Sequence, residues 1–262
     1  MALRKPGFCL SGLLLLLLTL PPVAAGQSSA SLQDTINLDG KLYHVQGLGL
    51  DNDHFWVTSV DTANHRGYLH QFNRATGKFE RQIDLSDGSR YHPGGFSIQG
   101  NSIWVPVAEY KPNSTALLEE IDKRTLAVKR KFIVSDHIGC VAVHGDTLIA
   151  GNWDSRRFYV VNFQGKQLQV FDNPETNRYQ DIKFAGGMLV ASGVFNHKNG
   201  AVDWLAWPSL KLVHRISFGL TDRGLPYTAE GMAILGQNLY LLPENGPSRV
   251  FHWLIEPGFG TR

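Results

Sequence analysis

Cysteine is nearly absent from this chain. The 262 residues include two cysteines, Cys9 and Cys140. Cys9 lies in a leader segment that we expect to be removed, so the mature chain would keep one cysteine and could form no intramolecular disulfide. Cys140 stands in the apolar run Cys140-Val141-Ala142-Val143, which indicates a packing residue rather than a nucleophile. The fold must therefore be stabilised by a buried core and not by disulfide bonds.

A strong charge of either sign is also missing. Lys and Arg number 25 against 23 Asp and Glu, which gives a formal net charge of +2. No basic face is visible, so we expect no nucleic-acid partner. The sequence also lacks a Gly-x-Ser-x-Gly elbow, a His-Glu-x-x-His motif, a Cys-x-x-Cys pair and a phosphate-binding glycine loop. Any site must therefore be assembled from residues that are distant in sequence.

One long hydrophobic run is present, at residues 10–20. It follows Arg4 and Lys5 and precedes Pro21-Pro22 and the small residues Val23-Ala24-Ala25. This arrangement predicts a secretory signal peptide at residues 1–25, cleaved after Ala25. A membrane anchor is the alternative, but the run is short for a bilayer span. We therefore expect one domain over residues 26–262, in the periplasm or outside the cell, with no membrane attachment after cleavage.

A pattern of strand, tight turn and strand occurs five times, beginning at His44, Tyr91, His137, Arg178 and Thr228. The copies follow one another at intervals of roughly 40–50 residues, which is typical of propeller blades. Each copy alternates in twos, is rich in β-branched and aromatic residues, and is interrupted by Gly, Asn and Asp turns. No sustained stretch shows the helical period. The sequence predicts an all-β, five-bladed β-propeller.

The ends of the chain predict how the ring closes. Residues 34–38 read as a strand without a partner in the first repeat, whereas the fifth repeat supplies three strands, at residues 231–235, 239–242 and 249–255. We therefore expect the N-terminal strand to complete the last blade. A six-bladed ring is the rival, but too little chain remains for another blade.

Repeat equivalence predicts a site on the propeller axis, because the innermost strands of all blades approach that axis. His44, His92 and His137 occupy one equivalent position, followed by Arg178 and Thr228 in the last two blades. Side chains two residues further on point to the same side of a strand. These second positions are Gln46, Gly94, Gly139, Gln180 and Glu230.

Three interpretations of this ring remain open. The histidines could brace neighbouring blades, bind a polar ligand, or hold a divalent metal such as zinc, manganese or calcium through His44, His92 and His137. Arg178 would repel a cation, and it favours an anionic ligand or an ion pair with Asp181 or Glu230. Glu230 is the candidate acid or base, since it would lie beside neutral imidazoles, and His92 is the second catalytic candidate.

A second candidate surface is formed by the loops on one face of the disc, because loops on a rigid scaffold often carry function. Trp153, Arg156, Glu244 and Arg249 are the loop residues that we select as ligand-binding candidates. The alternative is that they are ordinary solvated loop residues. An exposed tryptophan beside charges is typical of a binding surface.

Three phrases carry a resemblance to known proteins: His54-Phe55-Trp56-Val57-Thr58-Ser59-Val60-Asp61, Tyr91-His92-Pro93-Gly94-Gly95-Phe96 and Val105-Pro106-Val107-Ala108-Glu109-Tyr110. They resemble a secreted bacterial β-propeller family of unknown function over residues 40–255. Gln46-Gly47-Leu48 is similar to the first-blade motif of the five-bladed glutamine cyclotransferases. Glu230-Gly231-Met232 is similar to a segment of gluconolactonase-like propellers, which bind calcium on their axis. No catalytic residue is carried over from either enzyme family.

These observations favour a secreted binding or scaffold protein. It would recognise a small polar or anionic molecule, or a peptide, at the axial mouth or on the loop face. The alternative function is a hydrolase or lyase, with or without a metal ion, with its site on the axis.

Overall fold

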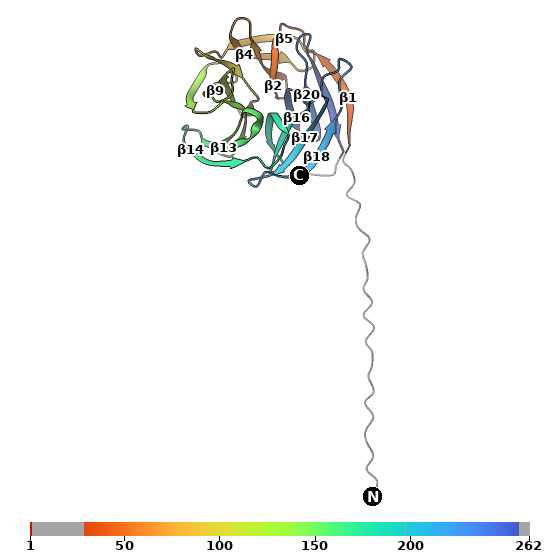
Figure 1. The fold of residues 1–262 in the computed structure, drawn as a ribbon. Coiled ribbons are helices and arrows are strands. Elements are labelled where there is room, and N and C mark those ends of the chain that lie inside the picture. The colour runs from red at the N-terminus through yellow and green to blue at the C-terminus, as the bar shows by residue number, and fades with distance from the viewer. Residues whose placement is uncertain (2–28, 197, 257–262) are drawn as a thin grey trace.

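The computed structural model describes residues 1, 29–196 and 198–256, so nearly all of the predicted signal peptide lies outside the described residues. Five small antiparallel sheets are arranged as blades around a central axis (Figure 1). The prediction of an all-β, five-bladed propeller is confirmed. Within the described ranges the only helical element is the single 3₁₀ turn η1 (Trp153–Ser155). The same ranges hold no helix that is long and apolar enough to cross a membrane.

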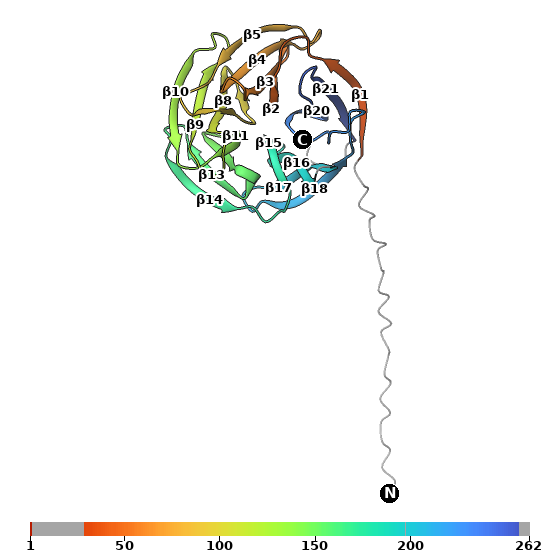
Figure 2. The ribbon, with the colours of Figure 1, turned by 45° about the horizontal axis from the view of Figure 1, so that its top comes forward.

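Blades one to four each place their first strand at the axis and their last at the rim (Figure 2). Blade one consists of β2 (His44–Leu50), β3 (His54–Asp61), β4 (Arg66–Asn73) and β5 (Phe79–Asp84). Blade two consists of β6 (Arg90–Pro93), β7 (Ser97–Gln99), β8 (Ser102–Glu109), β9 (Ala116–Asp122) and β10 (Val128–Val134). Blade three consists of β11 (Ile138–His144), β12 (Thr147–Asn152), β13 (Arg157–Asn162) and β14 (Gln167–Asp172). Blade four consists of β15 (Arg178–Ala185), β16 (Met188–Asn196), β17 (Asn199–Ala206) and β18 (Lys211–Phe218).

Blade five is built from both ends of the chain. Its inner strands are β19 (Gly231–Leu235), β20 (Asn238–Leu242) and β21 (Arg249–Ile255), and β1 (Ala30–Asn37) pairs antiparallel with β21. The predicted closure by the N-terminal strand is confirmed. The strand begins at Ala30 rather than Asp34, because a register shift between Leu32 and Asp34 interrupts the alternation that would reveal its start.

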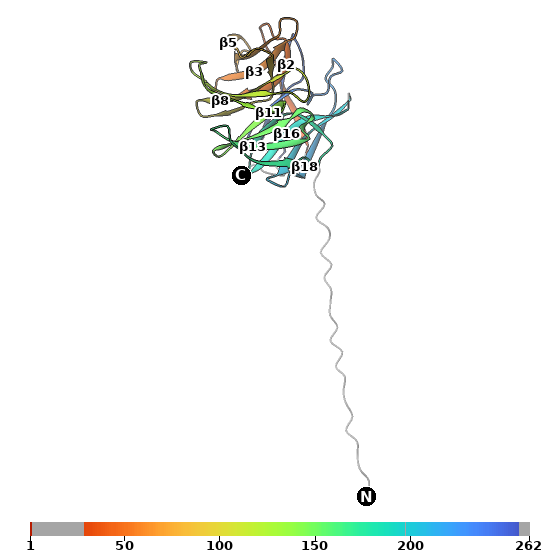
Figure 3. The same cartoon turned by 60° about the vertical axis from the view of Figure 1, so that its left-hand side comes forward.

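The core lies between blades rather than in one central cluster. Figure 3 shows the strands of successive blades, from β3 through β8 and β13 to β18, following one another around the ring. Between blades five and one, for example, Leu48, Phe55 and Phe72 pack with Leu242 and Val250, all of them fully buried. Burying one such side chain stabilises the fold by roughly 1.5–3 kcal/mol. Because each sheet is covered on both faces by its neighbours, the ring needs no disulfide.

The inner strand of blade two is interrupted where it meets blade three. Gly94 and Gly95 separate β6 from β7, and Gly95 forms a parallel bridge with Cys140 of β11. A Cβ atom at Gly94 would lie 1.9 Å from the carbonyl oxygen of Gly139, so no other residue fits without moving the backbone.

Candidate functional site

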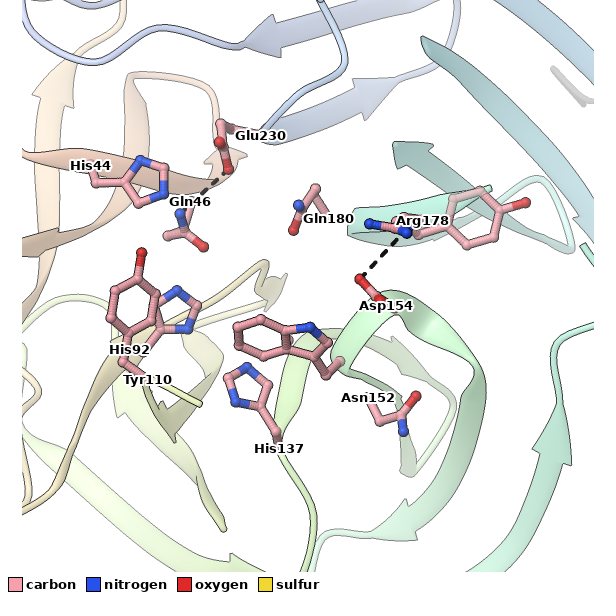
Figure 4. A pocket seen from close by; sticks show the side chains of 13 residues that line it. His44, Gln46, His92, Tyr110, His137, Asn152, Asp154, Arg178, Gln180 and Glu230 are labelled. Carbon is pink, nitrogen blue, oxygen red and sulfur yellow. Dashed lines mark hydrogen bonds and ion pairs between the residues drawn. The ribbon is translucent and has the colours of Figure 1, made fainter. Parts of the chain in front are cut away.

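The innermost strands begin around one mouth of the axis, where their first side chains enclose a pocket of about 200 Å³ (Figure 4). The pocket is lined by His44, Gln46, His92, Tyr110, His137, Gly139, Asn152, Trp153, Asp154, Arg178, Tyr179, Gln180 and Glu230. The structure thus brings together the three histidines, Arg178 and Glu230. Thr228, the fifth member of the predicted ring, is instead buried and donates a hydrogen bond to the carbonyl of Gly193 at 2.7 Å.

Equivalent β-bulges aim the second ring of side chains at this pocket. The pairing of inner and second strands skips one residue in each of blades one, three and four, at Gln46, Gly139 and Gln180. A bulged residue leaves the ladder, so its side chain can turn away from the sheet face. Glu230 immediately precedes β19 in blade five. The bulges therefore turn residues at equivalent positions of the repeats towards the axis.

Glu230 and Gln46 form the polar centre of the pocket. Nε2 of Gln46 donates to Oε2 of Glu230 at 3.4 Å and to its neighbouring carbonyl, that of Val45, at 2.9 Å. Loss of hydration on burial raises the pKa of Glu230 well above its usual value. The pocket contains no cation close enough to oppose this effect. Glu230 therefore favours the protonated form, in which its hydroxyl can donate a hydrogen bond to a ligand.

His92 and His137 form a neutral aromatic wall. Burial lowers the pKa of His92 to about 3, and the nearby His137 and His44 add to the shift. His92 stacks on Tyr110 with ring centroids 4.5 Å apart, and its buried Nδ1 has no hydrogen-bond partner in the described chain. Nδ1 of His137 lies 3.0 Å from the carbonyl oxygen of Lys111. That oxygen can only accept, so Nδ1 carries the proton and Nε2 of His137 is left as an acceptor.

The predicted metal site receives no structural support. His44, His92 and His137 line one pocket, but the described part of the chain contains no group of three or more His, Cys, Asp or Glu side chains placed to hold a metal ion. The rings of His92 and His137 are 5.4 Å apart, and Nδ1 of His44 is engaged with Asn245 at 3.1 Å. The metal assignment therefore stays a prediction from sequence.

Arg178 and Trp153 form the outer rim of the pocket. The guanidinium group of Arg178 lies 4.0 Å from the carboxylate of Asp154, and both side chains are largely exposed. Such an exposed pair is weak, so Arg178 is free to meet an anionic group of a ligand. The indole of Trp153 packs edge-on against His137, with centroids 4.5 Å apart at 80°.

Asp181 does not belong to the pocket, and neither predicted partnership of Arg178 is seen. The Asp181 carboxylate is fully buried below the mouth, where Oδ1 accepts from Lys183 at 2.5 Å and Oδ2 accepts from the backbone amides of Leu48 and Met232. Arg178 instead faces Asp154. Arg178 stands at the exposed start of β15, whereas Asp181 lies three residues further along the strand, in the buried interior.

The other loop candidates lie outside the pocket and have structural partners. Arg156 donates to the carbonyl oxygens of Asp154, Glu175 and Asn177. Glu244 is buried and paired with Arg249 at 2.5 Å, and this arginine also contacts Asp222. These contacts order the loops. Trp153 is the member of this group that lines the pocket.

Several pocket residues were missing from the sequence-based selection. Gln46 and Gln180 occupy the second repeat-equivalent position, so the repeat contained the signal that could have selected them. Asn152 is the last residue of β12 and Asp154 lies in η1, and no periodicity encodes the path that brings them to the pocket. Lys183, the partner of Asp181, gave no signal at all, because an isolated lysine in a strand normally indicates an exposed face.

Fold and site together define a five-bladed β-propeller with a polar pocket at one axial mouth. The chain belongs to a family of unknown function, DUF6454, whose sequence pattern matches residues 27–184. No curated protein matches the chain. In fold it is similar to the glutaminyl cyclase of Myxococcus xanthus, with a TM-score of 0.67, 12% identity, and coverage of 87% of this chain and 97% of that one. It is also similar to the Pan2 WD40 domain of Neurospora crassa, with a TM-score of 0.51, 6% identity, and coverage of 90% and 98%.

Proposed function

We propose that the axial pocket binds a small polar molecule. The observation that carries this proposal is the convergence of Glu230, Gln46 and His137 from three blades on one cavity of about 200 Å³. That volume is the space of roughly seven water molecules, which suits a ligand no larger than one amino acid or one sugar unit.

The groups that face the pocket specify the chemistry of the ligand. The protonated carboxyl of Glu230 supplies a donor, whereas Oε1 of Gln46 and Nε2 of His137 supply acceptors, because both hydrogens of Gln46 Nε2 are already donated within the protein. Hydroxyl or amide groups on the ligand would satisfy both kinds. A carboxylate or phosphate on the ligand would additionally meet Arg178 at the rim.

Enzymatic hydrolysis or elimination is the second candidate function. It is favoured by one feature, the raised pKa of Glu230 in a pocket with neutral imidazoles, since a buried carboxylic acid can protonate a leaving group. The Myxococcus xanthus glutaminyl cyclase shows that this fold can carry an enzyme, but at 12% identity the likeness concerns the fold alone. Turnover of any bound ligand would decide for this candidate.

A thermal-shift screen with small polar molecules, including amino acids, hydroxy acids and monosaccharides, tests the proposal. A ligand that raises the melting temperature should then be titrated by calorimetry against Glu230→Ala and the surface control Arg66→Ala. Loss of one hydrogen bond in the pocket should weaken binding about tenfold or more in Glu230→Ala. Arg66 lies on blade one, paired with Asp84 and half exposed, so its variant should bind normally. Equal binding by both variants would place the ligand elsewhere.

The pH dependence gives a second readout. Glu230 donates a hydrogen bond only while protonated, so binding should weaken as the pH rises through its raised pKa. Glu230→Gln, whose amide donates at every pH, should lack this transition. A ligand whose affinity is flat with pH in the native protein would contradict the assigned role of Glu230.

A further inference from the structure

A second, wider cavity adjoins the axial pocket. It is an open groove of about 570 Å³ between residues 112–114 of blade two and residues 152–159 of blade three. Asn152, Trp153 and Asp154 line both cavities, so the two share one wall. A ligand long enough to pass over Trp153 would therefore reach from the pocket into the groove.

The shared wall is held rigidly. The side chain of Asn152 donates to Asp136 at 3.1 Å and accepts from the amide of Arg157 at 2.8 Å. The hydroxyl of Tyr159 also donates to Asp136 at 2.7 Å, and the amide of Trp153 bonds the carbonyl of His137 at 3.0 Å. These bonds fix the groove before a ligand arrives, which reduces the entropy lost on binding.

The charges of the groove favour a neutral ligand. Two acidic side chains, Asp136 and Asp154, are balanced by Arg156 and Arg157. The donors of Arg156 are engaged by backbone carbonyls, and both oxygens of Asp136 are occupied by protein donors. Arg157 is 60% exposed and lies 4.0 Å from the carboxylate of Asp172. Its side chain also interacts with the hydroxyl of Tyr159, which leaves the other guanidinium donors to meet ligand hydroxyls.

The strands beside the groove offer no open edge for a peptide. An extended peptide is usually held by pairing with an open strand edge. Strands β12 and β13, which supply this wall, are interior strands of their sheet and have neighbours on both sides. The available elements are instead an indole, a phenol ring, hydroxyls and a guanidinium. This set matches a sugar chain, whose C–H faces pack on aromatic rings while its hydroxyls meet the polar groups.

We propose that pocket and groove together bind a linear neutral oligosaccharide, with its terminal unit in the axial pocket and the following units across Trp153 in the groove. This inference rests on the proposed function of the axial pocket. It assigns to Trp153 the stacking surface between the first and second units, and to Arg157 a contact made only by the units in the groove.

The test uses the purified mature protein and calorimetry with chito-, cello-, malto- and xylo-oligosaccharides, each from monomer to pentamer. In at least one series the trimer should bind about tenfold more tightly than the monomer. Arg157→Ala should remove most of that gain and leave monomer affinity unchanged, whereas Trp153→Ala should weaken the trimer more strongly. Arg66→Ala, a matched exposed arginine on another blade, should bind like the native protein.

The outcomes separate this inference from the proposed function. If no series gains affinity with length, or if the gain survives in Arg157→Ala, the groove assignment is overturned, even where a monomer or another small molecule still binds in a manner that depends on Glu230. A peptide panel that binds more tightly with length and depends on Arg157 would overturn the saccharide class. Oligosaccharide binding that is unaffected by Glu230→Ala would support the groove and remove the axial pocket as the anchor.

Discussion

The backbone amides of Leu48 and Met232 donate to the same carboxylate oxygen of Asp181, at 3.1 and 2.9 Å. Each amide lies two residues beyond a polar side chain of the pocket, Gln46 in blade one and Glu230 in blade five. The buried carboxylate of blade four thus joins three inner strands just below the site. Lys183 supplies the compensating charge and also donates to the carbonyl of Phe96 at 2.6 Å, which includes blade two in the same network.

Replacing Asp181 with alanine should therefore destabilise the whole ring. The change leaves two buried amides without an acceptor and the ammonium group of Lys183, only 12% exposed, without its carboxylate. We expect a loss of about 3–5 kcal/mol in the free energy of unfolding, measured by urea denaturation. Asp84→Ala, which removes an exposed ion pair, should cost less than about 1 kcal/mol. Equal effects of the two variants would show that the network does not join the blades.

Acid should destabilise the protein through His92. Its pKa is about 3 in the folded state and 6.5 ordinarily, so the unfolded chain binds an extra proton between these values. The stability that neutral His92 provides is complete above pH 6.5 and is lost as the pH falls towards 3. Between pH 7 and pH 4, His92→Phe should lose less unfolding free energy than the native protein, by on the order of 3 kcal/mol. Parallel pH profiles for the two proteins would contradict the burial of a neutral imidazole.

Removal of the N-terminal strand should open the ring. Residues 26–40 include β1, which covers the edge of β21 along its whole length. Without β1 that edge exposes unpaired amides and carbonyls, which pair readily with other molecules. A variant that lacks residues 26–40 should aggregate or form oligomers in size-exclusion chromatography. A soluble monomer with an unchanged melting temperature would argue that closure contributes little.

The basic start, short apolar run and small residues at positions 23–25 lead us to propose export through a cleaved signal peptide. N-terminal sequencing of protein recovered from the periplasm or medium should begin at Gly26. The precursor blocked by Ala25→Arg should remain uncleaved, because the residue before the cleavage site must be small. A mature protein that begins at Met1 would contradict the proposal.

The repeat pattern was sufficient to predict the five blades, the closure by an N-terminal strand and most strand positions. These features depend on the alternation of apolar and polar residues and on the residues at turns, both of which can be seen directly in the sequence. The equivalence of His44, His92 and His137 also correctly predicted that three histidines would meet at one mouth. Where a bulge broke the alternation, as at the start of β1, the predicted boundary was displaced.

The tertiary structure decided which of these residues face the pocket and which form buried structural contacts. Bulges at Gln46 and Gln180 turn those side chains towards the axis, and the bulge at Gln180 also sends Asp181 down into the network with Lys183. A bulge changes the facing of every later residue on its strand, so repeat equivalence alone cannot tell the two fates apart. The loop path that brings Trp153 beside His137 likewise depends on packing between blades. Sequence therefore determined the ring and its axis, whereas contacts between distant strands determined the site.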